Sequence, residues 1–396
     1  MNKVSLVACD AYEDEKVFNA LSSAIDNLGG IKEFVKPNQT VVLKVNLVIK
    51  FAPERAATTH PCVVGNLAKL CFEAGAKRVI VADSAGSPYN KNTMNANYNV
   101  TGMTKASEVY GFELNQNFDS FEVNFEDGKV AKTFEILDIL TQADVIINVC
   151  KLKSHSFTGI TNATKNIFGV VPGLKKVQMH GQFQTLNNFS NMLYDLWQYF
   201  KDKIVLSVSD AIIGMEGEGP TNGNPRKMGL IMCSKNPVAM DVVGARIMNV
   251  SPTEMPTIKT GIERGYLKDE NDFEVVGANV EDFVLKDFDK RTPNMYTPFS
   301  TNVPKFVQPL LHKLTTQRPC VRKRKCLGCA TCARHCPVGA ITMIEQRNGK
   351  KYAKFDYTKC IRCFCCQELC PFGIVKVKTG IAYRFLHRKK SKNKEK

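Results

Sequence analysis

Eight cysteines near the end of the chain form two copies of one motif. Each copy has three cysteines with two residues between neighbours, then a fourth after three more residues, followed by proline. Two-residue gaps let three thiolates wrap one face of an iron–sulfur cubane, while the fourth cysteine lies beyond the loop and faces the other cluster. The spacing predicts two [4Fe–4S] clusters with crossed ligands: Cys326, Cys329, Cys332 and Cys370 for one, and Cys336, Cys360, Cys363 and Cys366 for the other.

Two further cysteines in this region fall outside the repeat. Cys365 is out of register with the ligand spacing, and Cys320 precedes the first motif. Both are therefore expected to be structural thiols, with oxidation-sensitive thiols as the alternative. For the motifs themselves, paired zinc sites are the alternative to iron–sulfur clusters.

Polar side chains also follow the carboxyl ends of several strands predicted in the first 290 residues. Ligands bind beyond these ends in a parallel sheet, so the side chains there are expected to form a pocket. Neither GxGxxG nor GxxxxGK[ST] occurs, so no dinucleotide fingerprint or P-loop is supported. The residues predicted to bind a cofactor at the strand ends are Lys44, Asn46, His60, Asp83, Lys151, Lys153, His155 and Lys165.

His155 and Lys165 are the predicted catalytic residues of this pocket. Several lysines beside one imidazole need an anionic counterpart, which predicts a phosphate, a carboxylate or an anionic cofactor. The alternative for His155 is a loop histidine with ordinary hydrogen bonds. His180 is a further candidate ligand. Three acids follow the last predicted strand: Asp210, Glu216 and Glu218. They could bind a hard cation or act as acid–base groups, and the alternative is that they are solvated acids of a glycine-rich loop.

The elements that must position these residues alternate between strands and helices. This alternation predicts βαβ units, and hence an α/β domain with a mainly parallel sheet flanked by helices. The cysteine repeat adds a small α+β two-cluster domain. The predicted strands cover residues 4–9, 40–47, 78–82, 144–149 and 204–208, and the first two predicted helices cover residues 13–28 and 61–74.

Composition divides the chain into a near-neutral body and a basic end. Residues 318–396 hold 21 Lys and Arg against 4 Asp and Glu, a net charge of +17. Because the whole chain has a net charge of +16, the remaining residues carry a net charge of −1. The predicted units are an α/β domain at residues 1–290, a proline-rich linker at 291–317, the cluster domain at 318–380 and a basic tail at 381–396.

The basic end has more than one interpretation. It fits a solvated tail, and it fits a docking surface for an acidic redox partner such as a flavodoxin or a ferredoxin. Aromatic residues beside the basic run also fit a membrane surface. Nucleic acid is disfavoured, because no binding motif accompanies the charge.

The location expected from the sequence is the cytoplasm. The first ten residues carry too short an apolar run for a signal peptide, and no stretch of about eighteen apolar residues occurs. In that compartment, fifteen cysteines favour metal or redox chemistry over disulfides.

Four segments resemble the DUF362 family, in the family's order. They are TTHP at 58–61, ADSAG at 82–86, KLKSHSFTGITNATKNIFG at 151–169 and DAIIGMEGEGPTNGNP at 210–225. DUF362 is a domain of unassigned activity, often fused to a two-cluster ferredoxin module, and the cysteine repeat resembles that module independently. Residues 143–166 more distantly resemble nickel-pincer lactate racemases. That resemblance implies cofactor contacts at His155 and Lys165, although the spacing after Gly159 differs and the full set of histidines is missing.

Together these features predict an iron–sulfur electron-transfer protein with a DUF362-like domain. The alternative is an oxidoreductase whose clusters feed a cofactor or an anionic substrate at the strand ends. A scaffold or maturation factor that hands on its clusters is disfavoured, because ferredoxin-type ligation is tight.

Overall fold

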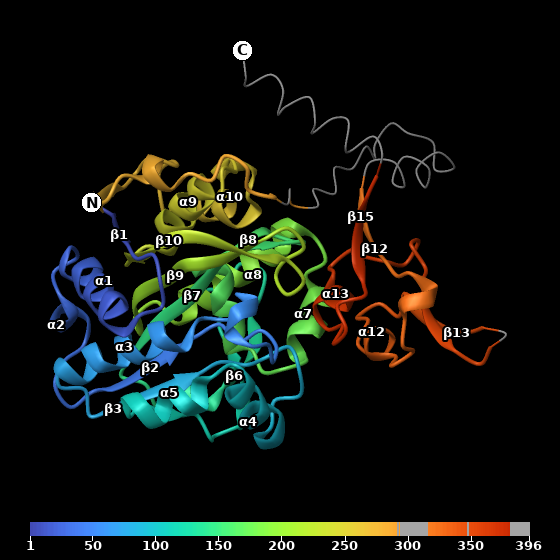
Figure 1. Cartoon of the computed structure of the whole chain (residues 1–396), viewed down its shortest axis with the longest axis horizontal. Helices are drawn as coiled ribbons and strands as arrows, with labels where there is room; N and C mark the ends of the chain where they lie inside the picture. Colours follow the sequence, from blue (N-terminus) through green and yellow to red (C-terminus); the bar gives the residue numbers. More distant parts are fainter. Residues whose placement is uncertain (291–292, 294–315, 347, 381–396) are drawn as a thin grey trace, which may run out of the picture.

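A computed structural model shows a large α/β body and a smaller cluster module beside it (Figure 1). The structure describes residues 1–290, 293, 316–346 and 348–380. Most of the predicted linker (291–317) and all of the predicted basic tail (381–396) lie outside the described residues. Within the described part, the first strand of the module begins at Gln317.

The body is built on one nine-stranded sheet, with the path β11-β1-β10-β9-β7-β2-β3-β4 and β8 paired to β7. β2 lies parallel to β3 and β7, and β7 lies parallel to β9. β10 is antiparallel to β1 and β9. The predicted mainly parallel sheet is therefore confirmed. The strands are β1 (Lys3–Ala8), β2 (Thr40–Lys44), β3 (Arg78–Ala82), β4 (Glu113–Leu114), β7 (Val145–His155), β8 (Gly159–Thr161), β9 (Ile204–Glu216), β10 (Asn224–Ser234) and β11 (Glu274–Gly277).

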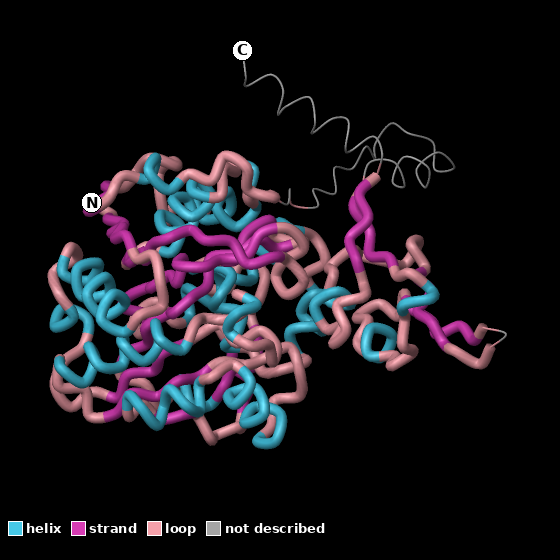
Figure 2. Tube along the Cα trace, in the orientation of Figure 1, coloured by secondary structure: helices cyan, strands magenta, loops and turns pink. Residues whose placement is uncertain are grey.

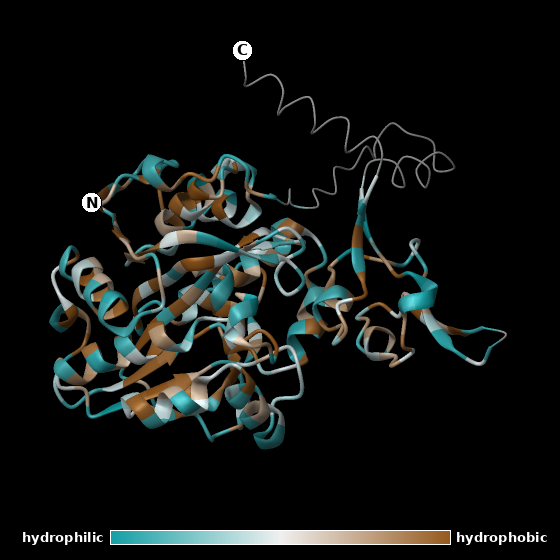
Figure 3. Ribbon diagram, in the orientation of Figure 1, coloured by the Kyte–Doolittle hydropathy of each residue, from teal (hydrophilic) through white to brown (hydrophobic). Residues whose placement is uncertain are grey.

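Helices cover both faces of this sheet because successive strand residues point to opposite sides. Val41 and Leu43 pack in one hydrophobic cluster and Val42 packs in another. The strands are the apolar centre of the body and the outer helix faces are hydrophilic (Figures 2 and 3). One cluster includes residues of α1 (Asp14–Asp26), α3 (Pro61–Glu73), α4 (Lys91–Val100) and α5 (Met103–Tyr110), whereas α8 (Leu186–Tyr199), α9 (Pro237–Ile247) and α10 (Pro256–Glu263) contribute to the others.

Local sequence explains where the main helices begin. Pro61 is the first residue of α3, and the His60 side chain accepts a hydrogen bond from the backbone N–H of Cys62. Asn236 caps α9 in the same way. The shorter elements are α2 (Ile31–Phe34), α6 (Ala163–Asn166), α7 (Lys175–Gln182), and the hairpin of β5 (Ser120–Asn124) and β6 (Thr133–Leu137).

Two strands extend beyond their predicted ends. Residues 151–155 and 210–216 were expected in loops, but β7 continues to His155 and β9 continues to Glu216. The extension of β7 pairs with β8, and that of β9 pairs with β10. These antiparallel partners satisfy the backbone hydrogen bonds of residues that carry polar side chains.

The cluster module is a small α+β unit, as predicted. β12 (Gln317–Cys320) pairs with β15 (Lys376–Thr379), and β13 (Ile341–Glu345) pairs with β14 (Lys351–Phe355). Helix α13 (Cys365–Glu368) lies near α7 of the body, and α12 (Thr331–Arg334) lies farther out (Figure 1). Phe364 is buried in a hydrophobic cluster formed mostly by body residues, which ties the α13 side of the module to the body.

Candidate functional site

The cysteines of the module surround two separate cavities. We name them by their position. The outer cavity is lined by Cys326, Cys329, Cys332 and Cys370, and the inner cavity by Cys336, Cys360, Cys363 and Cys366. These are the two predicted crossed sets, and neither Cys320 nor Cys365 lines either cavity. Four thiols around an otherwise apolar wall fit a [4Fe–4S] cluster in each cavity. Among the described residues, no three His, Cys, Asp or Glu side chains gather closely enough to hold a single metal ion.

A third cavity, here called the interdomain pocket, lies between the body and the module. It has a volume of about 90 Å³, which is room for a small anion together with water. Its body wall comes from the ends of β2, β3, β7 and β8 and from α6 and α7, and its module wall comes from α13 and the residue after it. The charged and imidazole side chains that line it are Lys44, Asp83, Lys153, His155, Lys165, Lys176, His180 and Glu368.

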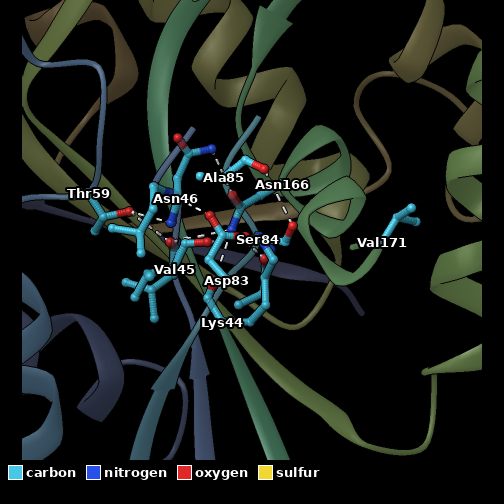
Figure 4. A network of polar contacts seen from close by, with 12 residues as sticks. Lys44, Val45, Asn46, Thr59, Asp83, Ser84, Ala85, Asn166 and Val171 are labelled. Atoms are coloured by element: carbon cyan, nitrogen blue, oxygen red, sulfur yellow. Dashed lines mark hydrogen bonds and ion pairs between the residues drawn. The ribbon is translucent and has the colours of Figure 1, made fainter. Parts of the chain in front are cut away.

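Lys44 and Asp83 form a buried ion pair at the floor of this pocket (Figure 4). Their strands are parallel neighbours, so the Lys44 ammonium lies 3.0 Å from the Asp83 carboxylate. Burial lowers the pKa of Lys44, and the carboxylate partly opposes that shift. A side chain on Gly169 would collide with both members of the pair, which explains the glycine there.

His155 presents an N–H group toward the module. Its Nδ1 accepts hydrogen bonds from the backbone N–H groups of Phe157 and Thr158, at 3.1 and 3.3 Å. The proton of the neutral ring is therefore on Nε2, which lies 3.4 Å from the Glu368 carboxylate. Burial lowers the pKa of His155 well below its usual value, so the ring is neutral. Burial has the opposite effect on Glu368 and raises its pKa.

Lys153 and Lys176 titrate near neutral pH. Burial lowers the pKa of each to about 7, and nearby lysines add to the effect. Lys153 donates to the Asn46 side chain at 2.9 Å, and Lys176 donates to the Ser84 side chain at 2.8 Å. Both ammonium groups are thus fixed in the wall of the pocket, where a bound anion would favour their charged forms.

Several polar groups of the pocket lack a hydrogen-bond partner among the described residues. The Lys165 ammonium lies 4.6 Å from the centre of the Phe168 ring and 5.4 Å from that of Phe189, and it has no hydrogen-bond acceptor among the described residues. The Nδ1 atom of His180 and the hydroxyl of Thr161 are buried and have no partner. One carboxylate oxygen each of Asp83 and Glu368 also has no hydrogen bond, although both oxygens lie in an ion-pair contact. Buried polar groups are normally satisfied, so the His180 nitrogen and the Thr161 hydroxyl are available to bind a ligand.

Two of the eight predicted cofactor residues lie elsewhere. His60 stacks on Tyr12 at 3.6 Å between ring centres, and the Lys151 ammonium lies 2.8 Å from Asp210. The register of β7 against β9 shifts between Lys151 and Lys153, which separates this network from the pocket. Lys44, Asn46, Asp83, Lys153, His155 and Lys165 do line the pocket.

The three acids proposed for a hard cation do not come together. Asp210 binds Lys151, Glu216 lies 3.9 Å from Arg226, and Glu218 lies 2.9 Å from Lys376 of the module. Each of these carboxylates already has a cationic partner, so the expected cation site is not formed in the described part of the chain.

Two charged pocket residues were absent from the sequence prediction. Lys176 lies four residues before His180 on α7, so both side chains project from one helix face. A helical pattern around the candidate His180 would have pointed to it. Glu368 is the single acidic residue of the second cysteine motif, but nothing in the spacing indicates that it faces the body.

Family models match two parts of the chain. Residues 41–246 match the domain of unknown function DUF362, and residues 325–374 match a 4Fe-4S dicluster domain. The second match, with the cysteines described above, implies two [4Fe–4S] clusters and iron–sulfur electron transfer. The zinc alternative is thereby set aside.

One curated relative aligns with about two thirds of the chain. The thylakoid-associated protein sll1697 of Synechocystis sp. is 32% identical over 265 residues, which cover 65% of this chain and 78% of the relative. In the described residues, no helix has the length and apolar content needed to cross a membrane. The cytoplasmic location stays a prediction.

Two solved structures are weakly similar to the chain. The lactate racemase apoprotein of Thermoanaerobacterium thermosaccharolyticum aligns with a TM-score of 0.34 at 12% identity, over 53% of this chain and 50% of the racemase. A protein from Thermotoga maritima aligns with a TM-score of 0.31 at 16% identity, over 57% of this chain and 56% of that protein. The chain thus spans about half the length of these structures, and similarity at this level carries no argument about chemistry.

Proposed function

Because the chain belongs to the DUF362 family and carries a 4Fe-4S dicluster domain, we propose that it is an iron–sulfur oxidoreductase. The clusters, when bound, supply one-electron transfer. The proposed partner in that exchange is an anionic small molecule held in the interdomain pocket.

The observation that carries this proposal is the shared wall of the pocket. Cys365, Glu368 and Leu369 of the module line it together with the lysines of the body. Cys365 is followed in the chain by Cys366, which lines the inner cavity. Cys363, another inner-cavity residue, packs in one hydrophobic cluster with Val177 of α7. A molecule in the pocket therefore lies about one residue away from the inner cluster site.

The chemistry of the lining favours an anion. Four lysines face two carboxylates, and the carboxylate of Asp83 is already paired with Lys44. The Lys165 ammonium lies beside aromatic rings, and the His180 ring nitrogen and the Thr161 hydroxyl have no hydrogen bond among the described residues. These groups together suit a carboxylate or a phosphate-like group.

The roles proposed for the lining residues follow from their surroundings. Lys165 binds the anion directly. His155 orients it through the Nε2 proton, and Lys153 and Lys176 hold or supply protons because their pKa values are about 7. Removing water from such a site strengthens each of these interactions.

Native mass spectrometry of the full chain, purified without oxygen, tests the proposal. We expect a small-molecule mass in addition to two clusters, lost in Lys165→Ala and retained in Lys16→Ala. Lys16 is a matched control because its side chain is 48% exposed on the body surface. Sulfate binding measured by calorimetry provides a second readout for a molecule that dissociates during purification.

The proposal fails if the wild-type chain carries clusters alone and binds no sulfate. The remaining function would then be that of an electron carrier between proteins, with no molecule in the pocket.

A further inference from the structure

The outer cavity opens on an apolar spot at the surface. Six large hydrophobic side chains are exposed in the described residues, and two of them, Leu327 and Phe372, line this cavity. Their exposed fractions are 67% and 50%. Cys329, a third lining residue, is the one cysteine among the described residues classed as exposed. Exposed apolar side chains that lie together, rimmed by polar residues, mark interaction sites.

Basic side chains border this spot. Arg322, Lys323, Arg324 and Lys325 are all exposed and directly precede Cys326 of the outer cavity. The backbone of Lys351 lies against Gly328, which adds another exposed cation at the same edge. An apolar centre with a charged rim is the usual anatomy of a protein–protein interface.

We propose that this outer face is the docking surface for an acidic one-electron carrier protein of the flavodoxin or ferredoxin type. The outer face comprises Leu327, Cys329 and Phe372 with the basic run from Arg322 to Lys325. Positive charge attracts an acidic carrier and orients it, and the apolar residues make the close contact. The four cysteines of the outer cavity would hold a cluster that could accept the one electron the reduced carrier gives up.

The position of the two cavities gives this exchange a direction within the molecule. The outer cavity reaches solvent, and the inner cavity lies against the body and the interdomain pocket. A cluster held by Cys326, Cys329, Cys332 and Cys370 would be the one nearer a docked carrier, and a cluster held by Cys336, Cys360, Cys363 and Cys366 would be the one nearer the interdomain pocket. The inference rests on the electron-transfer part of the proposed function and does not depend on an anion in the pocket.

Stopped-flow reduction of the full chain by a reduced acidic flavodoxin tests the outer face. The test variant is Lys323→Glu, Arg324→Glu and Lys325→Glu combined. The matched control is Lys32→Glu, Lys77→Glu and Lys105→Glu, three exposed lysines of the body, so that the net charge of the two variants is the same.

We expect the test variant to be reduced at least about tenfold more slowly than the wild type at low salt. The control should stay within about twofold, and the difference should shrink as salt screens the charges. Iron content and reduction by dithionite should be the same in all three proteins, which shows that the clusters are intact.

Several results would overturn the inference, and two concern the reduction rate. One is an unchanged rate in the test variant with intact clusters. The other is an equal loss in the control, which would show that net charge and not this face matters. If the face instead binds a second copy or an anionic lipid vesicle, the test variant will lose that binding while its rate with flavodoxin is unchanged, and the inference is again wrong. If the interdomain pocket binds no anion, the reduction rates and the iron content of these proteins are not affected.

Discussion

Lys165 differs from the other pocket lysines in what surrounds its ammonium group. Lys44 donates to the Val45 carbonyl, Lys153 to the Ala57 carbonyl, and Lys176 to the Val171 carbonyl. In the described part of the chain, Lys165 has aromatic rings instead of acceptors. An ammonium group in such surroundings gains most from an added anion, so the binding energy is expected to depend on Lys165 first.

The first prediction concerns sulfate as a probe of the pocket. Replacing Lys165 with alanine should weaken sulfate binding by about tenfold or more, because one charge-assisted contact contributes roughly 1.5–3 kcal/mol. Calorimetry at constant ionic strength measures the affinity for sulfate. Lys16→Ala should bind sulfate like the wild type, and equal weakening in that control would contradict the assignment.

The second prediction concerns pH. Lys153 and Lys176 have pKa values of about 7 in the free pocket, and a bound anion raises both, so binding takes up protons above pH 7. Sulfate affinity should therefore be nearly flat below about pH 6 and fall as the pH rises through 7, by up to about tenfold per unit for each lysine that must gain a proton. Calorimetry in buffers of different ionisation enthalpy counts the protons. Affinity that stays constant up to about pH 9 would be inconsistent with this account.

The third prediction separates the ligand cysteines from Cys365. Cys366→Ala should lose the inner cluster and reduce the iron content from about eight to about four atoms per chain. Cys365→Ala should keep about eight, because its thiol lines the interdomain pocket and neither four-cysteine cavity. Iron analysis and electron paramagnetic resonance of the reduced proteins measure both. Loss of a cluster in Cys365→Ala would show that the assignment by spacing is wrong.

At the residue scale, the cysteine spacing was the most informative part of the sequence. The motif repeats closely enough to predict both sets of four cysteines that surround the cavities. The pocket was only partly predictable. Lys44 and Asp83 were both predicted at strand ends, but the pairing of their strands is seen only in the structure. Glu368 enters from another domain, and no local pattern encodes a contact between domains.

At the scale of elements, the ends of β2 and β3 and the turn after α6 depend on one another. The Asp83 carboxylate accepts a hydrogen bond from the backbone N–H of Leu47 in addition to its ion pair with Lys44. Gly169 lets the turn pass directly over this pair. The same residues that shape the pocket floor therefore also fix the backbone after both strands.

The fourth prediction follows from this buried pair. Asp83→Leu should lower the free energy of unfolding by about 3–5 kcal/mol, because Lys44 is left buried without its counter-ion. The double variant Lys44→Met with Asp83→Leu should recover part of that loss. Urea denaturation followed by circular dichroism measures both. A single variant as stable as the wild type would show that the pair contributes little.

The sequence predicted the parallel strands better than the antiparallel ones. The strand at residues 78–82 has the predicted bounds, and β2 begins where expected. β7 and β9 were predicted too short, because their later residues are polar or small and a polar run usually indicates a loop. β8 and β10 hold those runs in the sheet, and this pairing depends on the tertiary structure and not on local propensity.

At the scale of the whole molecule, the module completes a pocket that the body begins. The Gln367 side chain donates to the Glu218 carbonyl at 3.0 Å, and the Asn222 side chain donates to the Gln367 carbonyl at 3.2 Å. Lys376 adds an ion pair to Glu218. These contacts hold α13 against the body, so occupancy of the pocket and the redox state of the inner cluster are expected to be coupled.

The measurement that tests this coupling most directly is a redox titration of the full chain with and without sulfate, followed by electron paramagnetic resonance at constant ionic strength. An anion beside the inner cluster repels the incoming electron, so sulfate should make one midpoint potential more negative by some tens of millivolts. The other potential should stay nearly constant, the Cys366→Ala variant should lack the responsive signal, and Lys165→Ala should show no response. If sulfate leaves both potentials unchanged in the wild type, or shifts both equally in Lys165→Ala, then the pocket and the inner cluster do not act together.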